Sequence, residues 1–299
     1  MSERSNQFLK RRNKEISRNF FNYDGSKSTN FILKLLIKFF YKFIKILRIF
    51  DLKYPEEIRL NRKLVKFSSL PKAFDTFKIL HISDTHFDLV NGIENKIYEI
   101  IKFKKFDVCF FTGDLSEDNS NYRESLRKFI FSFKDTRFKH GIYCVLGNHD
   151  SIQLYSEYKK HKINILFNES TKINKNRSSI IISGIDDSSF FFDKQNLLSL
   201  NEEKDRFKII LSHTPELIDI FEEKHFDLCC CGHTHGGQII LPYIKFPLFT
   251  GLCRFKNFYR GLQKYKSMQV HTSVGVGASI IPLRINCDPE ISMLELRKN

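Results

Sequence analysis

Short apolar runs that end in metal-ligand residues recur along this chain and constrain its fold more than any other feature. Five runs have this form: residues 77–82, 108–111, 142–146, 209–211 and 228–231. Runs of this length, closed by Gly or polar residues, are typical of buried β-strands. In an α/β sheet the side chains just past the carboxyl ends of the strands converge on one rim. The residues after the five runs are therefore expected to form one site.

The residues that follow these runs carry carboxylate, amide or imidazole groups. They are Asp84, His86, Asp114, Asn148, His213, His233 and His235. This mixture of oxygen and nitrogen ligands suits hard to borderline divalent metals. Each residue alone is better explained as a loop residue or a buried histidine, but five such motifs at five strand ends favour a metal centre. The set exceeds the need of one ion and suits two ions with a shared bridge, which points to displacement at phosphorus.

The segments between the runs predict helices, which makes the chain an α/β protein. The expected helices span residues 92–105, 122–133, 154–161, 196–205 and 215–224. Further strands are expected at residues 63–67, 180–185 and 291–296. A chain of 299 residues can bury a substantial core, and one catalytic domain with an N-terminal appendage fits this length.

Sequence patterns of other hydrolase classes are absent. The chain has no Gly-x-Ser-x-Gly elbow and no Gly-x-x-x-x-Gly-Lys loop, which favours direct attack by activated water over a protein nucleophile. Its seven cysteines include no Cys-x-x-Cys pair. Cys229, Cys230 and Cys231 are consecutive, so in a strand they point to alternate faces and are expected to be core residues. The odd count indicates a reducing compartment rather than a disulfide framework.

The order and spelling of the motifs resemble those of the calcineurin-like metallophosphoesterases. Asp-x-His, Gly-Asp, Gly-Asn-His-Asp, His and Gly-His-x-His follow one another as in that family, from about Phe77 to the C-terminus. The resemblance implies an α/β fold, a sandwich of two mixed β-sheets flanked by helices. The stretches 236–238 and 273–291 look similar to a bacterial, often membrane-associated branch of the family. That branch includes a UDP-2,3-diacylglucosamine pyrophosphatase of lipid A synthesis.

The resemblance also implies a role for each motif residue. The ligands divide into two metal sets and a bridge: Asp84, His86 and His235 for the first metal, Asn148, His213 and His233 for the second, and Asp114 between them. His149 would face the substrate and stabilise the phosphoryl oxygens or protonate the leaving oxygen; the alternative is a loop residue packed beside the metals. Asp150 would orient His149 or a nearby group. The two divalent ions are expected to be Mn²⁺, with iron and zinc as alternatives, because the same ligands accept all three.

An apolar stretch with two prolines, residues 239–252, begins shortly after His235. It is expected either to receive lipid chains at the mouth of the site or to form a hairpin packed on the sheet, and the sequence does not choose between them. Arg254, Arg260 and Arg284 are candidates to bind the substrate phosphate or diphosphate, because guanidinium groups match its oxygens.

The first seventy residues lie outside the resemblance and divide by composition. Residues 1–29 are polar and basic and predict a mobile tail. Residues 30–50 predict an amphipathic helix on a membrane surface. Residues 51–70 predict a linker and the first strand, and residues 71–299 the metallophosphoesterase catalytic domain.

The segment 31–50 is apolar and aromatic except for one stripe of lysines. The stripe is formed by Lys34, Lys38, Lys42 and Lys45. A lysine at the centre of a membrane-spanning helix costs about 2.5–3.5 kcal/mol, and no cleavage site for a signal peptide follows the segment. A helix lying in the interface of an anionic membrane fits better. The alternative is a helix packed on the catalytic domain or on another subunit.

The formal net charge of +15 favours anionic partners. No nucleic-acid-binding motif accompanies it, so nucleic acid is not an expected partner. The leading prediction is a phosphoester hydrolase that uses a metal-bridging hydroxide and lies peripherally on the inner face of the cell membrane, in the cytoplasm. Its substrate is expected to be a lipid-linked or nucleotide-sugar diphosphate such as UDP-2,3-diacylglucosamine. The alternatives are a phosphodiesterase or phosphatase of small soluble esters and a non-enzymatic scaffold, against which the complete ligand set argues.

Overall fold

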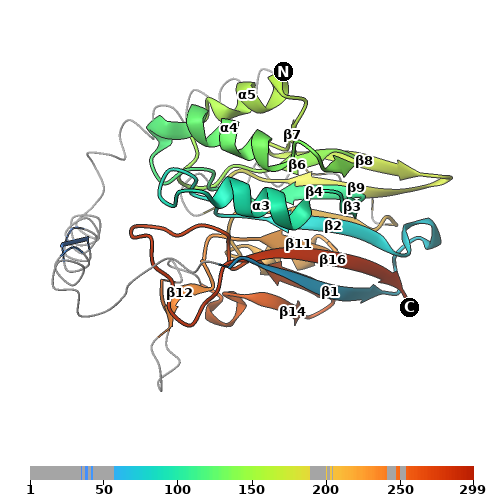
Figure 1. Ribbon diagram of the computed structural model, residues 1–299. Coiled ribbons are helices and arrows are strands. Elements are labelled where there is room, and N and C mark those ends of the chain that lie inside the picture. Colours follow the sequence, from blue (N-terminus) through green and yellow to red (C-terminus); the bar gives the residue numbers. More distant parts are fainter. Residues whose placement is uncertain are drawn as a thin grey trace.

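Two six-stranded mixed sheets form the centre of the molecule (Figure 1). The computed structural model describes residues 57–188, 205–240, 247–249 and 254–299, with the single positions 35, 38, 39, 42, 200 and 203. The two sheets pack face to face, and apolar side chains from both fill the space between them. The expected α/β sandwich of two mixed sheets is confirmed.

The first sheet has the strand order β1-β16-β2-β4-β6-β7. Its strands are β1 (Arg59–Phe67), β16 (Glu290–Lys298), β2 (Phe77–Ile82), β4 (Val108–Phe111), β6 (Ile142–Cys144) and β7 (Asn164–Ile165). From β2 to β7 the neighbours are parallel, while β16 runs antiparallel to β2 and parallel to the edge strand β1. The three strands that precede predicted ligands, β2, β4 and β6, therefore end at the same edge of the sheet.

The second sheet has the strand order β14-β15-β11-β10-β9-β8. Its strands are β14 (Gly261–Tyr265), β15 (Met268–Thr272), β11 (Leu228–Cys231), β10 (Lys208–Leu211), β9 (Ser178–Gly184) and β8 (Glu169–Lys175). The central strands β9, β10, β11 and β15 are parallel, and each edge is closed by an antiparallel pair. The strands β10 and β11, which precede the three remaining histidine ligands, also end at one edge.

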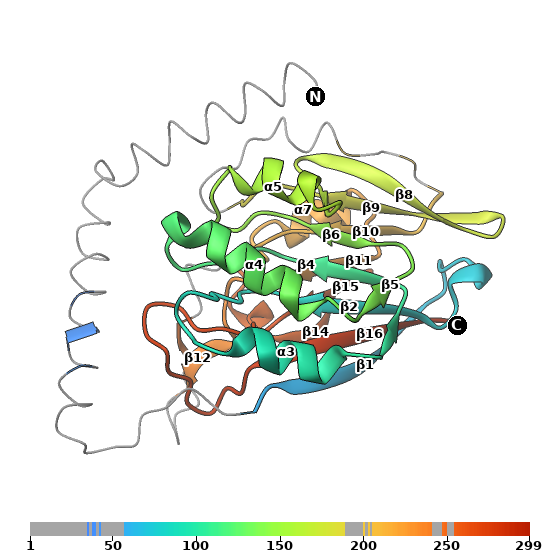
Figure 2. The same ribbon diagram turned by 45° about the horizontal axis from the view of Figure 1, so that its top comes forward.

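Helices cover the outer faces of the sandwich. They are α3 (Ile93–Ile101), α4 (Tyr122–Ser132), α5 (Leu154–Lys160) and α7 (Ile218–Glu223), with 3₁₀ turns η1 (Lys72–Phe74), η2 (Asn119–Asn121) and η3 (Lys256–Phe258). Figure 2 shows α3, α4 and α5 in front of the first sheet. Their apolar side chains share one core with that sheet, while α7 packs on the outer face of the second sheet.

The alternation of side chains in the strands matches these layers. In β11, Leu228 and Cys230 enter the core between the sheets, whereas Cys229 and Cys231 face the layer of α7. The expectation that the consecutive cysteines are core residues on alternate faces is confirmed. Six cysteines in the described part of the chain are buried free thiols.

Two small sheets complete the fold. One pairs β3 (Lys105–Phe106) with β5 (Arg137–Phe138), and the other pairs β12 (Gly237–Ile240) with β13 (Pro247–Phe249). The antiparallel pairing of β12 with β13 is what the hairpin interpretation of residues 239–252 expects. Residues 241–246 within this stretch lie outside the described residues.

The strands and most helices lie where they were expected, with small shifts at their ends. The helix expected at 92–105 stops at Ile101, because residues 105–106 pair as strand β3. The helix expected at 215–224 begins at Ile218. The helix expected at 196–205 lies outside the described residues apart from Leu200, Glu203 and Asp205.

The predicted basic tail 1–29 lies outside the described residues, as does most of the segment 30–50. Four positions of that segment are described, Leu35, Lys38, Phe39 and Lys42, and all are helical and exposed. Among the residues that the structure describes, no helix is both long and apolar enough to cross a membrane.

Candidate metal centre

Five strand ends bring the seven predicted ligands to one rim of the sandwich. The first sheet supplies Asp84 and His86 after β2, Asp114 after β4 and Asn148 after β6; the second supplies His213 after β10, and His233 and His235 after β11. Main-chain hydrogen bonds tie the loops of each sheet together. One joins the Asp84 N–H to the Gly113 carbonyl at 2.9 Å, and another joins the Gly232 N–H to the His213 carbonyl at 2.8 Å. The ligands therefore stand on loops that both sheets hold in place.

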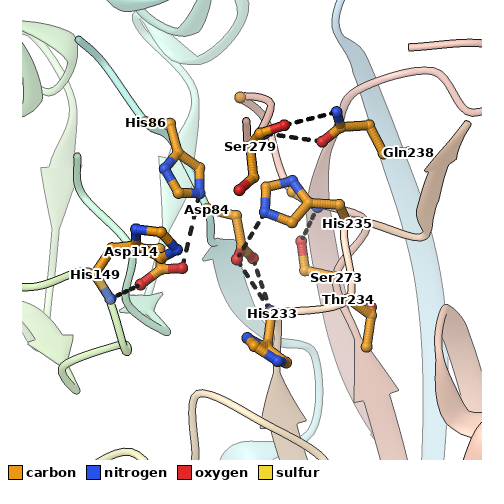
Figure 3. A network of polar contacts seen from close by, with 12 residues as sticks. Asp84, His86, Asp114, His149, His233, Thr234, His235, Gln238, Ser273 and Ser279 are labelled. Carbon is orange, nitrogen blue, oxygen red and sulfur yellow. Dashed lines mark hydrogen bonds and ion pairs between the residues drawn. The ribbon is translucent and has the colours of Figure 1, made fainter. Parts of the chain in front are cut away.

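The first predicted set gathers around Asp84. One ligand atom from each of Asp84, His86 and His235 lies within 4.8 Å of the others, and all three residues are buried. The His235 Nε2 lies 3.6 Å from an Asp84 carboxylate oxygen (Figure 3). The rings of His86 and His235 stack with centroids 5.0 Å apart. A carboxylate and two imidazoles thus face one point from three loops.

The second predicted set is more tightly gathered. Asp114, His213 and His233 also place ligand atoms within 4.8 Å of one another. The Asn148 Oδ1 lies 2.9 Å from the His213 Nε2 and 3.0 Å from the His233 Nδ1, and these two nitrogens are 3.2 Å apart. The other nitrogen of His213, Nδ1, lies 2.7 Å from the Thr112 carbonyl, which assigns a hydrogen to Nδ1 and leaves Nε2 facing the Asn148 and Asp114 oxygens.

Asp114 stands between the two sets. Its Oδ2 lies 3.3 Å from the His213 Nε2 of the second set and 3.7 Å from the His86 Nε2 of the first. Its Oδ1 accepts the main-chain N–H of His149 at 2.9 Å. One carboxylate oxygen therefore reaches toward both sets, which is the position that the predicted bridging role requires.

Five of the seven predicted ligands have a left-handed backbone. The φ angles of Asp84, His86, Asp114, His233 and His235 are 51°, 38°, 58°, 69° and 50°. Residues other than glycine adopt this conformation at a cost of order 1–3 kcal/mol, and such strain gathers at functional sites. The left-handed backbone thus marks these five loop positions as candidates for a functional role.

Two motif glycines are required by close approach. A Cβ atom on Gly147 would overlap the carboxylate of Asp114, and one on Gly232 would overlap the Ser83 hydroxyl and the Asp84 carboxylate. The glycines of the Gly-Asn-His-Asp and Gly-His-x-His motifs therefore let the loops of different strands touch.

Asp150 accepts main-chain N–H groups from two loops of the site. Its buried carboxylate accepts the N–H groups of Asp114 at 2.9 Å, Leu115 at 2.8 Å and Gly147 at 2.9 Å. These contacts match the expectation that Asp150 orients a nearby group, while its orientation of His149 stays a prediction. It satisfies buried donors of two loops that carry predicted ligands.

His149 lies at the edge of the two sets. Its ring packs edge-on against that of His86 with centroids 5.4 Å apart, and its side chain keeps 20% of its surface exposed. The Nδ1 lies 2.9 Å from the main-chain carbonyl of Glu117, which assigns the Nδ1 hydrogen to that contact. Figure 3 shows His149 beside Asp114 on the side of the first sheet.

The three candidate arginines have different surroundings. Arg284 is buried, and its guanidinium donates to the carbonyls of Gly277 and Val274 at 2.7 Å and of His235 at 3.1 Å. It braces the loop under the first set, so its predicted contact with substrate was wrong; a loop that buries carbonyls needs donors. The exposed Arg254 pairs with Asp219 of α7, and Arg260 is exposed on the surface.

Glu117 was not among the predicted site residues. It follows Asp114 by three positions in the same strand-end loop, and its Oε2 lies 3.2 Å from the His86 Nδ1. The signal that could have found it is an acidic residue just after the Gly-Asp motif, in the loop that also carries the bridge.

Burial sets the charge of the predicted ligands. It lowers the pKa of His233 to about 3 and holds the pKa values of His86 and His235 below their usual range, so these imidazoles keep a lone pair at neutral pH. Burial also raises the pKa of Asp84 to about 6. For His213 burial acts in the same direction, but the Asp114 carboxylate overrides it and holds this pKa well above its usual value. A divalent ion would compete with that proton.

The residues present fit divalent ions. Within the described part of the chain, the buried nitrogens His86 Nε2 and His235 Nδ1 have no hydrogen-bond partner. Orphaned buried nitrogens are costly unless a further group satisfies them. A divalent ion would satisfy them, and the imidazoles, two carboxylates and an amide oxygen gathered here are ligands that zinc, iron and manganese all accept.

Comparisons with known proteins agree with this geometry. Residues 77–237 match a family profile described as calcineurin-like phosphoesterase. Two relatives from Bacillus subtilis (strain 168) are the metallophosphoesterases YkoQ and YkuE, both named as uncharacterized. YkoQ is 26% identical over 73% of this chain and 83% of its own length, and YkuE is 27% identical over 81% and 87%. The phosphodiesterase YaeI of Escherichia coli (strain K12) is 31% identical over 52% of this chain and 57% of its own length.

Proposed function

The chain belongs to the calcineurin-like phosphoesterase family and is a phosphoester hydrolase, and from this premise we propose that it cleaves phosphodiester or diphosphate bonds with two divalent ions at the rim. The observation that carries the proposal is the position of the Asp114 Oδ2 between two sets of buried ligands. Asp84, His86 and His235 would hold one ion. Asn148, His213 and His233 would hold the other, with Asp114 between the two. Two ions held in this way lower the pKa of bound water and neutralise charge on the phosphoryl oxygens.

The chain's own residues prepare the site for this chemistry. The Thr112 carbonyl keeps the hydrogen of His213 on Nδ1, so Nε2 faces the second set. The carboxylate of Asp150 fixes the N–H groups on both sides of the bridge. In the proposed reaction His149 donates a proton to the leaving oxygen or stabilises the phosphoryl oxygens with its Nε2, because its Nδ1 is directed at the Glu117 carbonyl.

A diester is the favoured bond type. The relative YaeI, named a phosphodiesterase, shares 31% identity with half of this chain. Within that class we propose a lipid-bearing phosphate or a nucleotide-sugar diphosphate such as UDP-2,3-diacylglucosamine. The lysine stripe of the segment 31–50 supports this proposal, as do the apolar side chains of Leu35 and Phe39, which are 51% and 71% exposed. These features suit a peripheral protein on an anionic membrane, which we place at the cytoplasmic face.

The test of the chemistry measures bound metal and hydrolysis together. The purified full chain should contain two divalent ions per molecule by mass spectrometry and should cleave bis(p-nitrophenyl) phosphate faster than p-nitrophenyl phosphate, with stimulation by Mn²⁺. Dialysis against a chelator should remove both properties, and added Mn²⁺ should restore them. A chain that binds no metal and cleaves neither ester in the presence of Mn²⁺ would contradict the proposal.

The substrate is tested by comparing UDP-2,3-diacylglucosamine with the chromogenic diester. A kcat/KM at least about 100-fold higher for the lipid-bearing diphosphate supports the proposed substrate, a preference of about 3 kcal/mol. A higher value for the soluble diester instead assigns the protein to the alternative class of small-ester phosphodiesterases.

The membrane contact is tested with vesicles of phosphatidylglycerol and phosphatidylcholine. Removal of residues 1–50 should release the protein from anionic vesicles and leave the cleavage of the soluble diester unchanged. The double variant Leu35→Ser, Phe39→Ser keeps every lysine, so it isolates the apolar part of the contact. Cosedimentation of the truncated protein with the vesicles would reject the membrane role of the segment.

A further inference from the structure

We propose that Glu117 is a positioning residue that fixes the imidazole of His86 for the first ligand set and anchors the loop at Ile280 beside it. The inference rests on the proposed function, since it assigns His86 to an ion. It adds a role for one residue that contacts the predicted ligand His86, the substrate-facing His149 and the strained loop at Ile280.

The first contact concerns the tautomer of His86. The Glu117 Oε2 lies 3.2 Å from the His86 Nδ1, on the opposite side of the ring from Nε2, which lies 3.7 Å from the bridging Asp114 Oδ2. Within the described residues neither ring nitrogen of His86 makes a hydrogen bond. The Glu117 carboxylate thus lies at the ring nitrogen that does not face the Asp114 bridge. A hydrogen held on Nδ1 leaves the lone pair on Nε2, and a carboxylate in this position raises the basicity of the ligand.

The second contact concerns the loop that follows β15. The other oxygen of Glu117, Oε1, accepts the N–H of Ile280 at 3.1 Å. Ile280 has a φ of 68°, which is strained for a β-branched residue. The neighbouring Ser279 is held from the other side by the Gln238 side chain, which accepts its N–H at 2.8 Å and donates to its carbonyl at 2.9 Å (Figure 3). Gln238 follows His235 by three positions. The loop is therefore held by Glu117, which lies beside His86, and by Gln238, which lies close in sequence to His235.

The third contact is made by the main chain. The Glu117 carbonyl lies 2.9 Å from the His149 Nδ1. The backbone of Glu117 is itself held, because the Asp88 carboxylate accepts the N–H of Glu117 at 2.7 Å and that of Asp118 at 2.9 Å. Glu117 thus stands on a fixed backbone and can hold His86 and His149 in one relative orientation.

The chemistry of a carboxylate explains why this position needs Glu. One oxygen accepts the N–H of Ile280, and the other lies 3.2 Å from the His86 Nδ1. A glutamine has the same shape but only one acceptor oxygen, and its amide nitrogen would face one of the two donors. Glu117→Gln therefore keeps the packing and removes one of the two contacts.

The experiment compares Glu117→Gln with Asp118→Asn in the full chain. Asp118 is the exposed neighbour in sequence, so its variant makes the same charge change without a contact to His86. The measurements are Mn²⁺ binding by titration calorimetry, the ¹⁵N shifts of the His86 imidazole in metal-free protein, the melting temperature, and kcat and KM for bis(p-nitrophenyl) phosphate.

In Glu117→Gln one of the two ions is expected to bind about 10–100-fold more weakly. The His86 ring should change from the Nδ1–H tautomer to a mixture of both tautomers. The kcat should fall while KM stays within about twofold, and Asp118→Asn should match the wild type in every measurement.

A rescue variant separates positioning from loss of folding. Glycine adopts a φ of 68° without strain, so Ile280→Gly frees the loop from its need for Glu117. In the double variant Glu117→Gln, Ile280→Gly the amide oxygen of Gln can turn to His86. About half of the loss of Mn²⁺ affinity, on a logarithmic scale, should then be recovered. If Glu117→Gln fails to fold, the double variant carries the measurements.

Two results would overturn the inference. One is a folded Glu117 variant with wild-type Mn²⁺ affinity and an unchanged His86 tautomer. The other is an equal loss of affinity in Asp118→Asn, which would show a general charge effect. The His86 tautomer is measured in metal-free protein, so it tests the role of Glu117 independently of metal binding. A wild type that binds no ion and cleaves no diester would reject only the proposed function.

Discussion

Two groups of buried histidines lie in different regions of this molecule and have different neighbours. At the rim, the imidazoles of the ligand sets face carboxylate oxygens, as in the 3.3 Å approach of His213 to Asp114. In the interior, His81 of β2 and His271 of β15 face each other across the two sheets, with their Nδ1 atoms 2.8 Å apart, and the His81 Nε2 lies 3.0 Å from the Thr112 hydroxyl. One shared hydrogen joins the two Nδ1 atoms of the interior pair, whereas imidazoles gathered around carboxylates suit a cation.

Burial and proximity of histidines do not by themselves make a metal site. The interior pair joins the two sheets and is expected to contribute to the stability of the fold. The rim sets are the proposed site of hydrolysis. Thr112 connects the regions, because its hydroxyl contacts His81 and its carbonyl contacts His213. Variants of the rim should therefore lose activity with little loss of stability, and variants of the interior the reverse.

The largest effect is expected for Asp114→Ala. Loss of the oxygen between the sets should lower kcat by about 1000-fold or more, which is about 4 kcal/mol of activation free energy, and should remove both ions. Metal analysis and diester hydrolysis check this, with Asp118→Ala as the control in the same loop. Substantial turnover with two bound ions would contradict the bridging role.

His271→Leu should have the opposite profile. It leaves the His81 Nδ1 without its partner in the core, which should lower the free energy of unfolding by about 1–3 kcal/mol. Cleavage of the soluble diester at 25 °C should stay within about threefold of the wild type. Chemical denaturation and the diester assay measure the two effects, and a large loss of activity without a loss of stability would break the comparison.

The interior pair also predicts a pH dependence of stability. Burial lowers the pKa of His271 to about 3 and that of His81 well below its usual value; Lys63 and Glu290 are the other charged groups that act on the pair. The unfolded chain, with histidine pKa values near 6.5, takes up protons first as the pH falls. The stability from His271 is thus complete above about pH 6.5 and is lost toward pH 3.

Between pH 7 and pH 5.5 this loss should amount to about 1 kcal/mol for His271. Urea denaturation of the wild type and of His271→Leu at both pH values isolates the contribution, because the other titrating groups are common to both proteins. Equal pH dependence in the two proteins would contradict the prediction.

The smallest effect is expected for Arg254→Ala. The guanidinium of Arg254 pairs with Asp219 on the surface, and Lys266 forms a similar exposed pair with Glu222 of the same helix α7. Both Arg254→Ala and Lys266→Ala should change the KM for the diester by less than about twofold. A tenfold rise in KM for Arg254→Ala alone would assign Arg254 the substrate contact that the sequence suggested. The substrate-binding surface would then include residues beyond the two ligand sets.

The prediction that residues after the buried strands meet at one rim was possible because it depends on local sequence patterns. A buried strand has an apolar period and a polar end, and parallel strands place their ends at one edge. The left-handed backbone at Asp84 or His235 and the role of Asp150 followed from no such pattern, because they depend on which loops meet. Arg284 was misjudged for the same reason, since nothing in its neighbours along the chain indicates that its guanidinium is enclosed by carbonyls.

By itself the sequence determined the α/β class, the seven candidate ligands and their order, because strand burial and ligand chemistry depend on short segments; the sandwich of two sheets was implied by the resemblance of the motifs. Only the tertiary structure decided how these residues are used. It placed one oxygen of Asp114 between two sets, brought the Glu117 carboxylate next to His86 and Ile280 from separate loops, and paired His81 with His271 across the sheets. The physical reason is that each of these contacts joins residues far apart in the chain, and their geometry exists only when both sheets are folded.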